Sequence, residues 1–457
     1  MTGTTSTRLA LESLDERAVP SANPFDRFDQ PPTVVYTETN DPREGQNAVL
    51  AYRRDARTGE LTRIGKFATG GTGQLNVPKL VGPDDGDQQV QASADGRFLF
   101  AVNQGSDSVT AFRIRGNGGL ERVGTFASGG DQPDSIGIAG RYLYVANRGD
   151  AGQGNPGTTT PSVTAFTISR DGTLTRIANS TVSFPVGTFV TQTLVSPDNR
   201  FLFVESATLS GTAGGNTVST FRIQPDGQLV AAPGGPAGAG TDAPVLLGAA
   251  AHPRLNIVYT GFASSAQVGV FTYDETGRTS YVGPAADTGA APCWCVVSAD
   301  GRVLYVANTA TDSVSVFSLA DPLHPVQVQE YALGGPRTNA TGPGAANVFE
   351  IALDPTGRFL YAVTQSTDPA FPQGNQLHTL NVARDGTLSE PVAPVVFSTS
   401  DVPANAHPQG VEVVSTAGRG GEHDRDRVYV GFDPRDGDPD RPWDAPGLAR
   451  RFARQHG

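Results

Sequence analysis

The sequence lacks a surplus of basic residues, a long apolar run and any long stretch free of glycine and proline. Acidic residues outnumber basic ones by 46 to 34. Phosphate binding needs a basic face, so nucleic acid is not an expected partner. No run of about 18 apolar residues is present, which argues against a membrane-spanning helix. Nearly every window of about fifteen residues contains glycine or proline, which argues against long helices.

Glycine and proline are instead abundant, with 55 and 34 copies, and charged residues make up only 18% of the chain. This mixture is typical of an all-β chain with many tight turns.

The first 32 residues are polar and lack the apolar core of a secretory signal. Residues 11–20 resemble a short leader motif found on many exported proteins of some bacteria, and the alternative interpretation is a disordered tail. Two locations therefore stay open, either export to the periplasm or the medium, or the cytoplasm. At the other end, residues 433–457 are expected to form an acidic loop and a short basic tail.

Two short patterns rich in β-branched and aromatic residues alternate along the chain, as strands should. The first pattern occurs at residues 34–37, 98–101, 142–145, 201–204, 257–260, 303–306 and 359–362. The second occurs at residues 49–52, 109–112, 163–166, 218–221, 268–271, 314–317 and, more weakly, 377–380.

Turn residues repeat with the strands. In six of the seven units, a residue pair that ends in glycine follows the second pattern, for example Asp171-Gly172 and Asp226-Gly227. Glycine tolerates positive φ, so we expect two-residue hairpins between strands three and four. A second series, such as Asp95-Gly96 and Asp300-Gly301, joins strands one and two. Seven units of four antiparallel strands predict a seven-bladed β-propeller over residues 33–432.

The first unit starts at its second strand and lacks an inner one. Residues 411–414 can supply that strand and close the ring beside residues 34–37, which would hide both open edges. Residues 427–432 also have a strand-like pattern, and they either add a strand or displace part of blade one.

The repeated motifs SADGRFLFAVN (93–103), AGRYLYVAN (139–147), SPDNRFLFV (196–204) and SADGRVLYVAN (298–308) resemble the lactonase-type seven-bladed propellers. That family includes bacterial 6-phosphogluconolactonase and the fungal carboxymuconate-lactonising enzyme. The resemblance spans residues 33–432 and implies a propeller that acts on a small lactone or sugar-acid derivative, without a metal or other cofactor. It also implies an Arg–His pair at the start of one inner strand, and none of the seven corresponding positions has one.

The longest insertions fall on the face that carries the 2–3 and 4–1 connections, and function concentrates on such loops. We therefore expect the site in the funnel on this loop-rich face. His407 is predicted as general base near Glu350 or Asp401, with Arg337 stabilising the oxyanion. The predicted substrate-binding residues are Gln89, Gln91, Asp134, Gln192, Trp294 and Gln409.

Two further motifs need an interpretation. An extended strand through Cys293-Trp294-Cys295 would place both thiols on one side and Trp294 on the other, and we expect buried free thiols. The acidic residues Asp84, Asp85 and Asp87 could bind calcium, although a solvated turn is favoured. No metal site is predicted.

Two function classes remain open. The first is an enzyme that opens or forms a small lactone or related carboxylate. The second is a non-catalytic, exported binding propeller that uses the loop-rich face to hold a protein partner.

Overall fold

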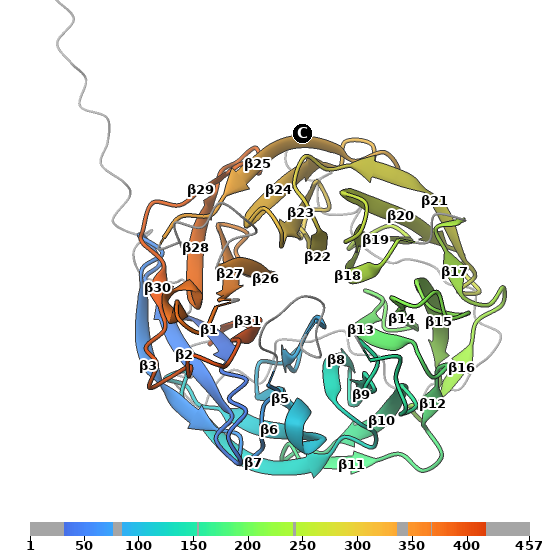
Figure 1. Ribbon diagram of the computed structural model, residues 1–457, viewed down its shortest axis with the longest axis horizontal. Helices are drawn as coiled ribbons and strands as arrows, with labels where there is room; N and C mark the ends of the chain where they lie inside the picture. The colour runs from blue at the N-terminus through green and yellow to red at the C-terminus, as the bar shows by residue number, and fades with distance from the viewer. Residues whose placement is uncertain are drawn as a thin grey trace, which may run out of the picture. The chain divides into compact units, whose positions relative to one another are not determined.

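Seven small antiparallel sheets stand side by side around a central axis in the computed structural model (Figure 1). The structure describes residues 32–75, 85–152, 155–240, 244–335, 346–366 and 368–416. These residues belong to the first of two units of the chain, which ends at Gly418. The predicted fold is confirmed. The termini, the boundary at 432 and the run 427–432 lie outside the described residues.

The strand nearest the axis opens each blade except the first, whose inner strand comes from the end of the described chain. From blade one to blade seven, the inner strands are β31 (Gln409–Ser415), β4 (Val90–Ala92), β8 (Pro133–Ala139), β13 (Phe189–Val195), β18 (Leu246–Ala251), β22 (Pro292–Val297) and β26 (Asn347–Leu353).

The two repeated sequence patterns form the second and third strands of every blade, as predicted. The second strands are β1 (Thr33–Glu38), β5 (Phe98–Asn103), β9 (Tyr142–Asn147), β14 (Phe201–Ala207), β19 (Ile257–Phe262), β23 (Val303–Asn308) and β27 (Phe359–Gln365). The third strands are β2 (Ala48–Arg54), β6 (Ser108–Ile114), β10 (Ser162–Ile168), β15 (Thr217–Ile223), β20 (Gln267–Tyr273), β24 (Ser313–Ser318) and β28 (Gln376–Val382).

The outer strands are more variable, and three of them are split into two short pieces that pair with the same third strand. They are β3 (Leu61–Ala68), β7 (Leu120–Ala127), β11 (Leu174–Arg176) with β12 (Val182–Ser183), β16 (Leu229–Ala231) with β17 (Ala237–Gly238), β21 (Thr279–Ala286), β25 (Val326–Ala332), and β29 (Leu388–Ser389) with β30 (Val395–Val396). Single 3₁₀ turns, η2 (Gln104–Ser106) and η4 (Pro372–Gly374), interrupt two loops. None of the helices in the described ranges is long and apolar enough to cross a membrane.

The core consists of seven hydrophobic clusters, one at each blade-to-blade contact. Each second strand is covered on both faces by neighbouring blades, and β5 and β9 are buried at every residue. A strand buried on both faces has no polar side, which explains why the first sequence pattern alternates only partially.

The predicted ring closure is confirmed. β31 pairs antiparallel with β1, with Val34 opposite Val414 and Thr37 opposite Val411. The first and last strands of the described chain therefore share one blade, and β31 covers the edge of β1 that would otherwise stay open.

In five blades, the hairpins between strands three and four contain three residues rather than the two that we expected, whereas the hairpin of blade one contains four and that of blade six is longer. In blade three, the Gly172 N–H donates to the Ser169 carbonyl and the Ser169 N–H donates to the Thr173 carbonyl. Gly172 has a φ of 93° and ends the turn. A three-residue loop with a left-handed last residue needs glycine as much as a two-residue turn does, so the sequence signal is the same for both.

Candidate functional site

Most inner strands carry a β-bulge at their start, which turns residues toward the axis. The pairing register shifts between Val190 and Gln192, between Leu247 and Ala249, and between Val348 and Glu350, and blades three and six have the same irregularity. Bulges re-aim side chains and are common beside binding sites. Here they direct Gln192 and Glu350 toward the central channel.

The segment 85–88, which leads into β4, crosses the channel at these strand starts. The Asp87 N–H donates to the Thr191 carbonyl at 3.0 Å, and the Ile136 N–H donates to the Gln88 carbonyl at 3.0 Å. The indole of Trp294 donates to the Gly86 carbonyl at 2.6 Å. The segment is thereby fixed to blades three, four and six.

Glycine at position 86 allows this close passage. A Cβ atom on Gly86 would lie 2.3 Å from the carboxyl carbon of Asp134, too close for any side chain.

Beyond this segment the channel holds a cavity of about 410 Å³. Its residues become more exposed along the inner strands. Asp87, Gln192 and Glu350 are buried at the strand starts, whereas Val297 and Leu353 are half-buried at the strand ends. The cavity therefore opens on the face that carries the short 1–2 turns, opposite the loop-rich face. The predicted loop-face site stays a prediction, because segments 76–84 and 336–345 lie outside the described residues.

Asp87 and Glu350 form a hydrogen-bonded carboxyl pair at the closed end of the cavity. Burial raises the pKa of Asp87 to about 7. Burial, followed by the negative charge of Asp87, raises the pKa of Glu350 well above its usual range. One proton is therefore shared by the pair near neutral pH. Oε1 of Glu350 is buried without a hydrogen-bond partner among the described residues.

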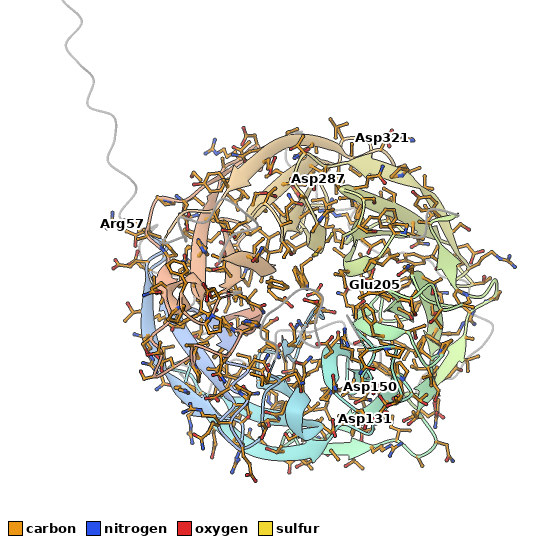
Figure 2. The ribbon with its side chains drawn as sticks, in the orientation of Figure 1. Arg57, Asp131, Asp150, Glu205, Asp287 and Asp321 are labelled. Carbon is orange, nitrogen blue, oxygen red and sulfur yellow. The ribbon has the colours of Figure 1, made fainter. Side chains whose placement is uncertain are left out.

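Two more carboxyl groups are held in the protonated form around the channel. Burial raises the pKa of Glu412, which lines the cavity from β31, to about 8. Burial also raises the pKa of Glu205 to about 8. Glu205 lies on β14 on the inner side of blade four, where the Thr260 hydroxyl donates to it (Figure 2).

The structure brings four of the predicted substrate-binding residues to this region. Gln91 and Gln192 line the cavity, and the Gln192 amide donates to the Gln88 side chain at 3.1 Å. Gln89 is buried and, like Trp294, donates to the Gly86 carbonyl. Gln89 and Trp294 thus hold the segment 85–88 rather than line the cavity.

Asp134 is neutralised by an arginine that the sequence analysis missed. Its carboxylate lies 3.7 Å from Nε of the buried Arg148 and accepts from Gln104. The Arg148 guanidinium stacks over the Phe189 ring at 4.4 Å. This pair supports the wall behind the segment 85–88.

The remaining predicted residues lie elsewhere. His407 is buried in the loop before β31, and it is not among the side chains that line the cavity. This loop is fixed because Asn375 and Gln365 donate to the Ala406 and Pro408 carbonyls. Gln409 is buried in blade one and donates to Glu38 at 3.3 Å. Arg337 lies outside the described residues. The roles of these three residues stay predictions.

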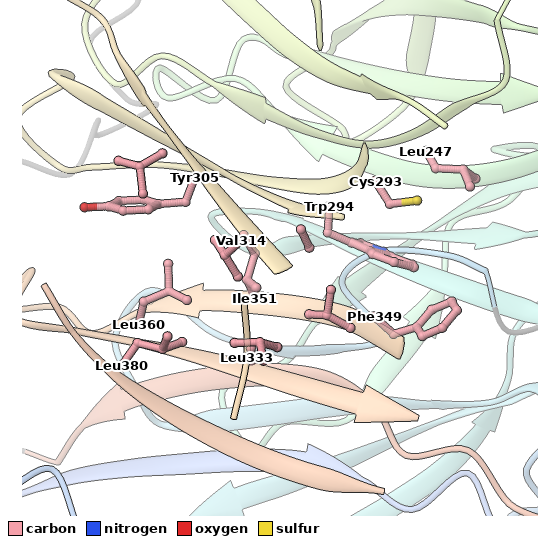
Figure 3. Close-up of a cluster of buried hydrophobic side chains, with 14 of the residues drawn as sticks. Leu247, Cys293, Trp294, Tyr305, Val314, Leu333, Phe349, Ile351, Leu360 and Leu380 are labelled. Atoms are coloured by element: carbon pink, nitrogen blue, oxygen red, sulfur yellow. The ribbon is translucent and has the colours of Figure 1, made fainter. Parts of the chain in front are cut away.

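The cysteines are free and buried, as expected, but they do not share one side of the strand. Cys293 and Trp294 pack in one hydrophobic cluster, where the indole lies 4.8 Å from the Phe349 ring (Figure 3). Cys295 packs in another cluster, with Tyr259. The bulge between Pro292 and Cys295 breaks the alternation on which our expectation rested.

Our expectation that Asp84, Asp85 and Asp87 form a solvated turn is wrong for the two residues that the structure describes. Asp85 and Asp87 are 2% and 7% exposed, because the segment enters the channel instead of the solvent. Asp84 lies outside the described residues. Within the described ranges, no group of three or more His, Cys, Asp or Glu side chains is arranged to hold a metal ion.

Residues 43–152 and 212–371 match a protein family described as lactonase, seven-bladed β-propeller. No curated protein matches the sequence. Among solved structures, a periplasmic gluconolactonase of Pseudomonas aeruginosa is 20% identical, with a TM-score of 0.62 over 85% of this chain and 100% of that one. A Bacteroides uniformis protein provisionally named a 6-phosphogluconolactonase is 17% identical, with a TM-score of 0.63 over 84% and 100%.

The same fold also occurs under other names. A Sulfolobus tokodaii protein described as a hypothetical selenium-binding protein is 11% identical, with a TM-score of 0.59 over 85% of this chain and 95% of that one. Structural similarity at these identities concerns the fold alone.

Proposed function

The chain belongs to the lactonase family of seven-bladed β-propellers, and we propose that it opens the ring of a small lactone in the central cavity. The observation that supports this function most is the Asp87–Glu350 pair at the closed end of that cavity. Two carboxyl groups that share one proton supply a base and an acid side by side, at a pH near neutrality.

The proposed reaction uses both members of the pair. The Asp87 carboxylate takes a proton from a water molecule while the water oxygen bonds to the lactone carbonyl carbon. The Glu350 carboxyl then donates its proton to the ring oxygen as the acyl C–O bond breaks. The product is a hydroxy acid, and the pair again holds one proton, now on Asp87. Transfer of that proton back to Glu350 restores the starting state.

Lactone opening by the full-length protein, followed as acid release at constant pH, tests this proposal. We expect turnover with a lactone panel, and we expect Glu350→Gln to lower kcat by about 10²-fold or more, the usual contribution of a general acid. Gln keeps the size of Glu350, so the variant tests proton donation rather than packing.

His407→Ala separates this site from the loop-face site. If Asp87 and Glu350 act, His407→Ala retains most of the turnover. Turnover that survives Glu350→Gln and disappears with His407→Ala would instead assign the reaction to the loop-rich face.

A second candidate function is supported by the missing Arg–His pair at the inner-strand starts. In this case the protein is a non-catalytic binding propeller that recognises its partner through the loop insertions. Replacing residues 368–376 with a short turn would then weaken partner binding, and no lactone in the panel would be opened.

A further inference from the structure

The chemistry of the cavity wall points to a particular class of substrate. Its polar side chains are three acids and three glutamines, and its other side chains are aliphatic, proline or cysteine. The polar side chains are Asp87, Gln88, Gln91, Gln192, Glu350 and Glu412. In the described part of the wall no arginine, lysine or histidine is present. A phosphorylated ligand would find no cation there and would face acidic groups instead.

The most deeply buried polar side chains of the cavity gather at its closed end, whereas the half-buried Gln91 and Glu412 lie further toward the mouth. Asp87, Glu350 and Gln192 lie at the closed end, where their inner strands begin. Val195, Val297 and Leu353 lie where the strands end, close to the mouth. A ligand whose ester group reaches the carboxyl pair therefore places the rest of its structure against these aliphatic side chains, with Gln91 and Glu412 as the polar side chains beside it.

Arginines do occur on the turn face, but they bind neighbouring turns and do not line the cavity. The Arg97 guanidinium donates to the Arg170 carbonyl of the next blade, and the Arg200 guanidinium donates to Glu275 of the next blade, both at 2.9 Å. Arg97 and Arg200 each lie 3.7 Å from an aspartate of the same turn. Each also stacks at 5.1 Å over the phenylalanine that follows it, on the second strand rather than the inner one. They hold the 1–2 turns and do not line the cavity.

From these observations we infer that the substrate is an uncharged lactone with an apolar substituent, rather than a phosphorylated or polyhydroxylated sugar lactone. The inference rests on the proposed function for the reaction that the substrate undergoes. The preference for an apolar over a phosphorylated ligand rests on the side chains of the cavity wall alone. The ring binds at the acidic end, and the substituent lies along β13, β22 and β26 toward the mouth. Burial of each added methylene should then improve kcat/KM about fourfold, until the chain reaches solvent.

The first experiment compares 5-alkyl δ-valerolactones, from unsubstituted to pentyl, with glucono-1,5-lactone and its 6-phosphate. We expect kcat/KM to rise along the alkyl series and to exceed that of the phosphate by about 10²-fold. A preference for the phosphorylated lactone would overturn the inference. Loss of that preference in Arg337→Ala would then identify the loop-rich face as the source of the phosphate contact.

The second experiment measures binding while turnover is slowed by about 10²-fold, by calorimetric titration of Glu350→Gln. We expect the pentyl lactone to bind at least tenfold more tightly than the 6-phosphate. We also expect Val297→Arg, which places a cation near the mouth, to remove this advantage. The matched control is Val328→Arg in the same blade, because Val328 lies on the outer strand and is 52% exposed.

The two experiments separate the inference from the proposed function. The expected binding preference without any lactone opening would contradict the proposed hydrolysis and support the apolar ligand. Lactone opening with a reversed binding preference would support the hydrolysis and overturn the apolar ligand.

Discussion

Asp87 and Glu350 illustrate how much of a site a sequence reveals one residue at a time. Glu350 could be predicted because it stands at the start of an inner strand, where a repeat alignment puts channel residues. Asp87 could not, since it belongs to an acidic connecting segment that by composition is typical of solvated turns. Its burial depends on contacts with blades three, four and six, which are distant in sequence. Arg148 was missed for the same reason.

The pH dependence of turnover should reflect the carboxyl pair. Asp87 must be ionised to act as the base, and its pKa is raised to about 7, so kcat/KM should rise with pH through about 7. At higher pH kcat/KM should fall as Glu350 loses its proton, because the pKa of Glu350 is raised further. Initial rates corrected for spontaneous ring opening check this profile. Glu350→Gln should abolish the alkaline limb, and a bell that persists in this variant would contradict the assignment.

Glu205 should make stability depend on pH. Burial raises the pKa of Glu205 to about 8, above the value of about 4.3 for an unfolded chain. The folded state therefore binds the proton more tightly, so its contribution to stability is complete below pH 4.3 and is lost as the pH rises through 8. We expect the Tm of the unsubstituted protein to fall between pH 6 and pH 9. In Glu205→Gln this fall should be smaller by roughly 4 °C or more, as melting curves at both pH values would show. The exposed Glu275 provides the control, since Glu275→Gln should leave the drop unchanged.

At the scale of strands and turns, the sequence predicted most of the structure. The two patterns are local, repeat seven times and end at glycines with positive φ, such as Gly172 and Gly227. The bulges that start the inner strands could not be predicted, because they lack a shared residue type. The alternation expected through Cys293 and Cys295 failed at one of them.

In several blades, a tyrosine on the second strand donates a hydrogen bond from its hydroxyl to a backbone carbonyl of the next blade. The contribution of this hydrogen bond to stability can be tested. The buried Tyr305 hydroxyl donates to the Gly386 carbonyl of the next blade at 3.0 Å. We expect Tyr305→Phe to lower the free energy of unfolding by about 1 kcal/mol, the usual net value of a buried hydrogen bond. Tyr361 is the equivalent residue in blade seven, and its buried hydroxyl has no hydrogen-bond partner in the described ranges. Denaturant titration of Tyr361→Phe should therefore show no loss, and equal losses would contradict this account.

At the scale of the molecule, the fold can be predicted from the sequence repeat. The candidate site depends instead on the positions where the repeat units differ from one another. Seven similar units were enough to predict a closed ring and the strand that closes it. Each unit, however, places a different residue at the start of its inner strand, and only the assembled ring shows which of these meet. The direction in which the cavity opens also depends on how the segment 85–88 crosses the ring, which no repeat pattern encodes.

Ring closure by β31 should be required for a cooperative fold. β31 places Val411, Val413 and Val414 in two hydrophobic clusters that join blade one to its neighbours. Burying each of these side chains stabilises the fold by about 1.5–3 kcal/mol. Their combined loss is comparable to the entire stability of a typical protein, about 5–15 kcal/mol. A chain that ends at residue 409 should therefore lose its cooperative thermal transition or melt at least about 10 °C lower.

A chain that ends at residue 416 keeps β31 and should melt like the full protein. If both truncations melt alike, β31 does not hold the ring closed. If the longer truncation is also destabilised, residues 417–457 contribute to closure.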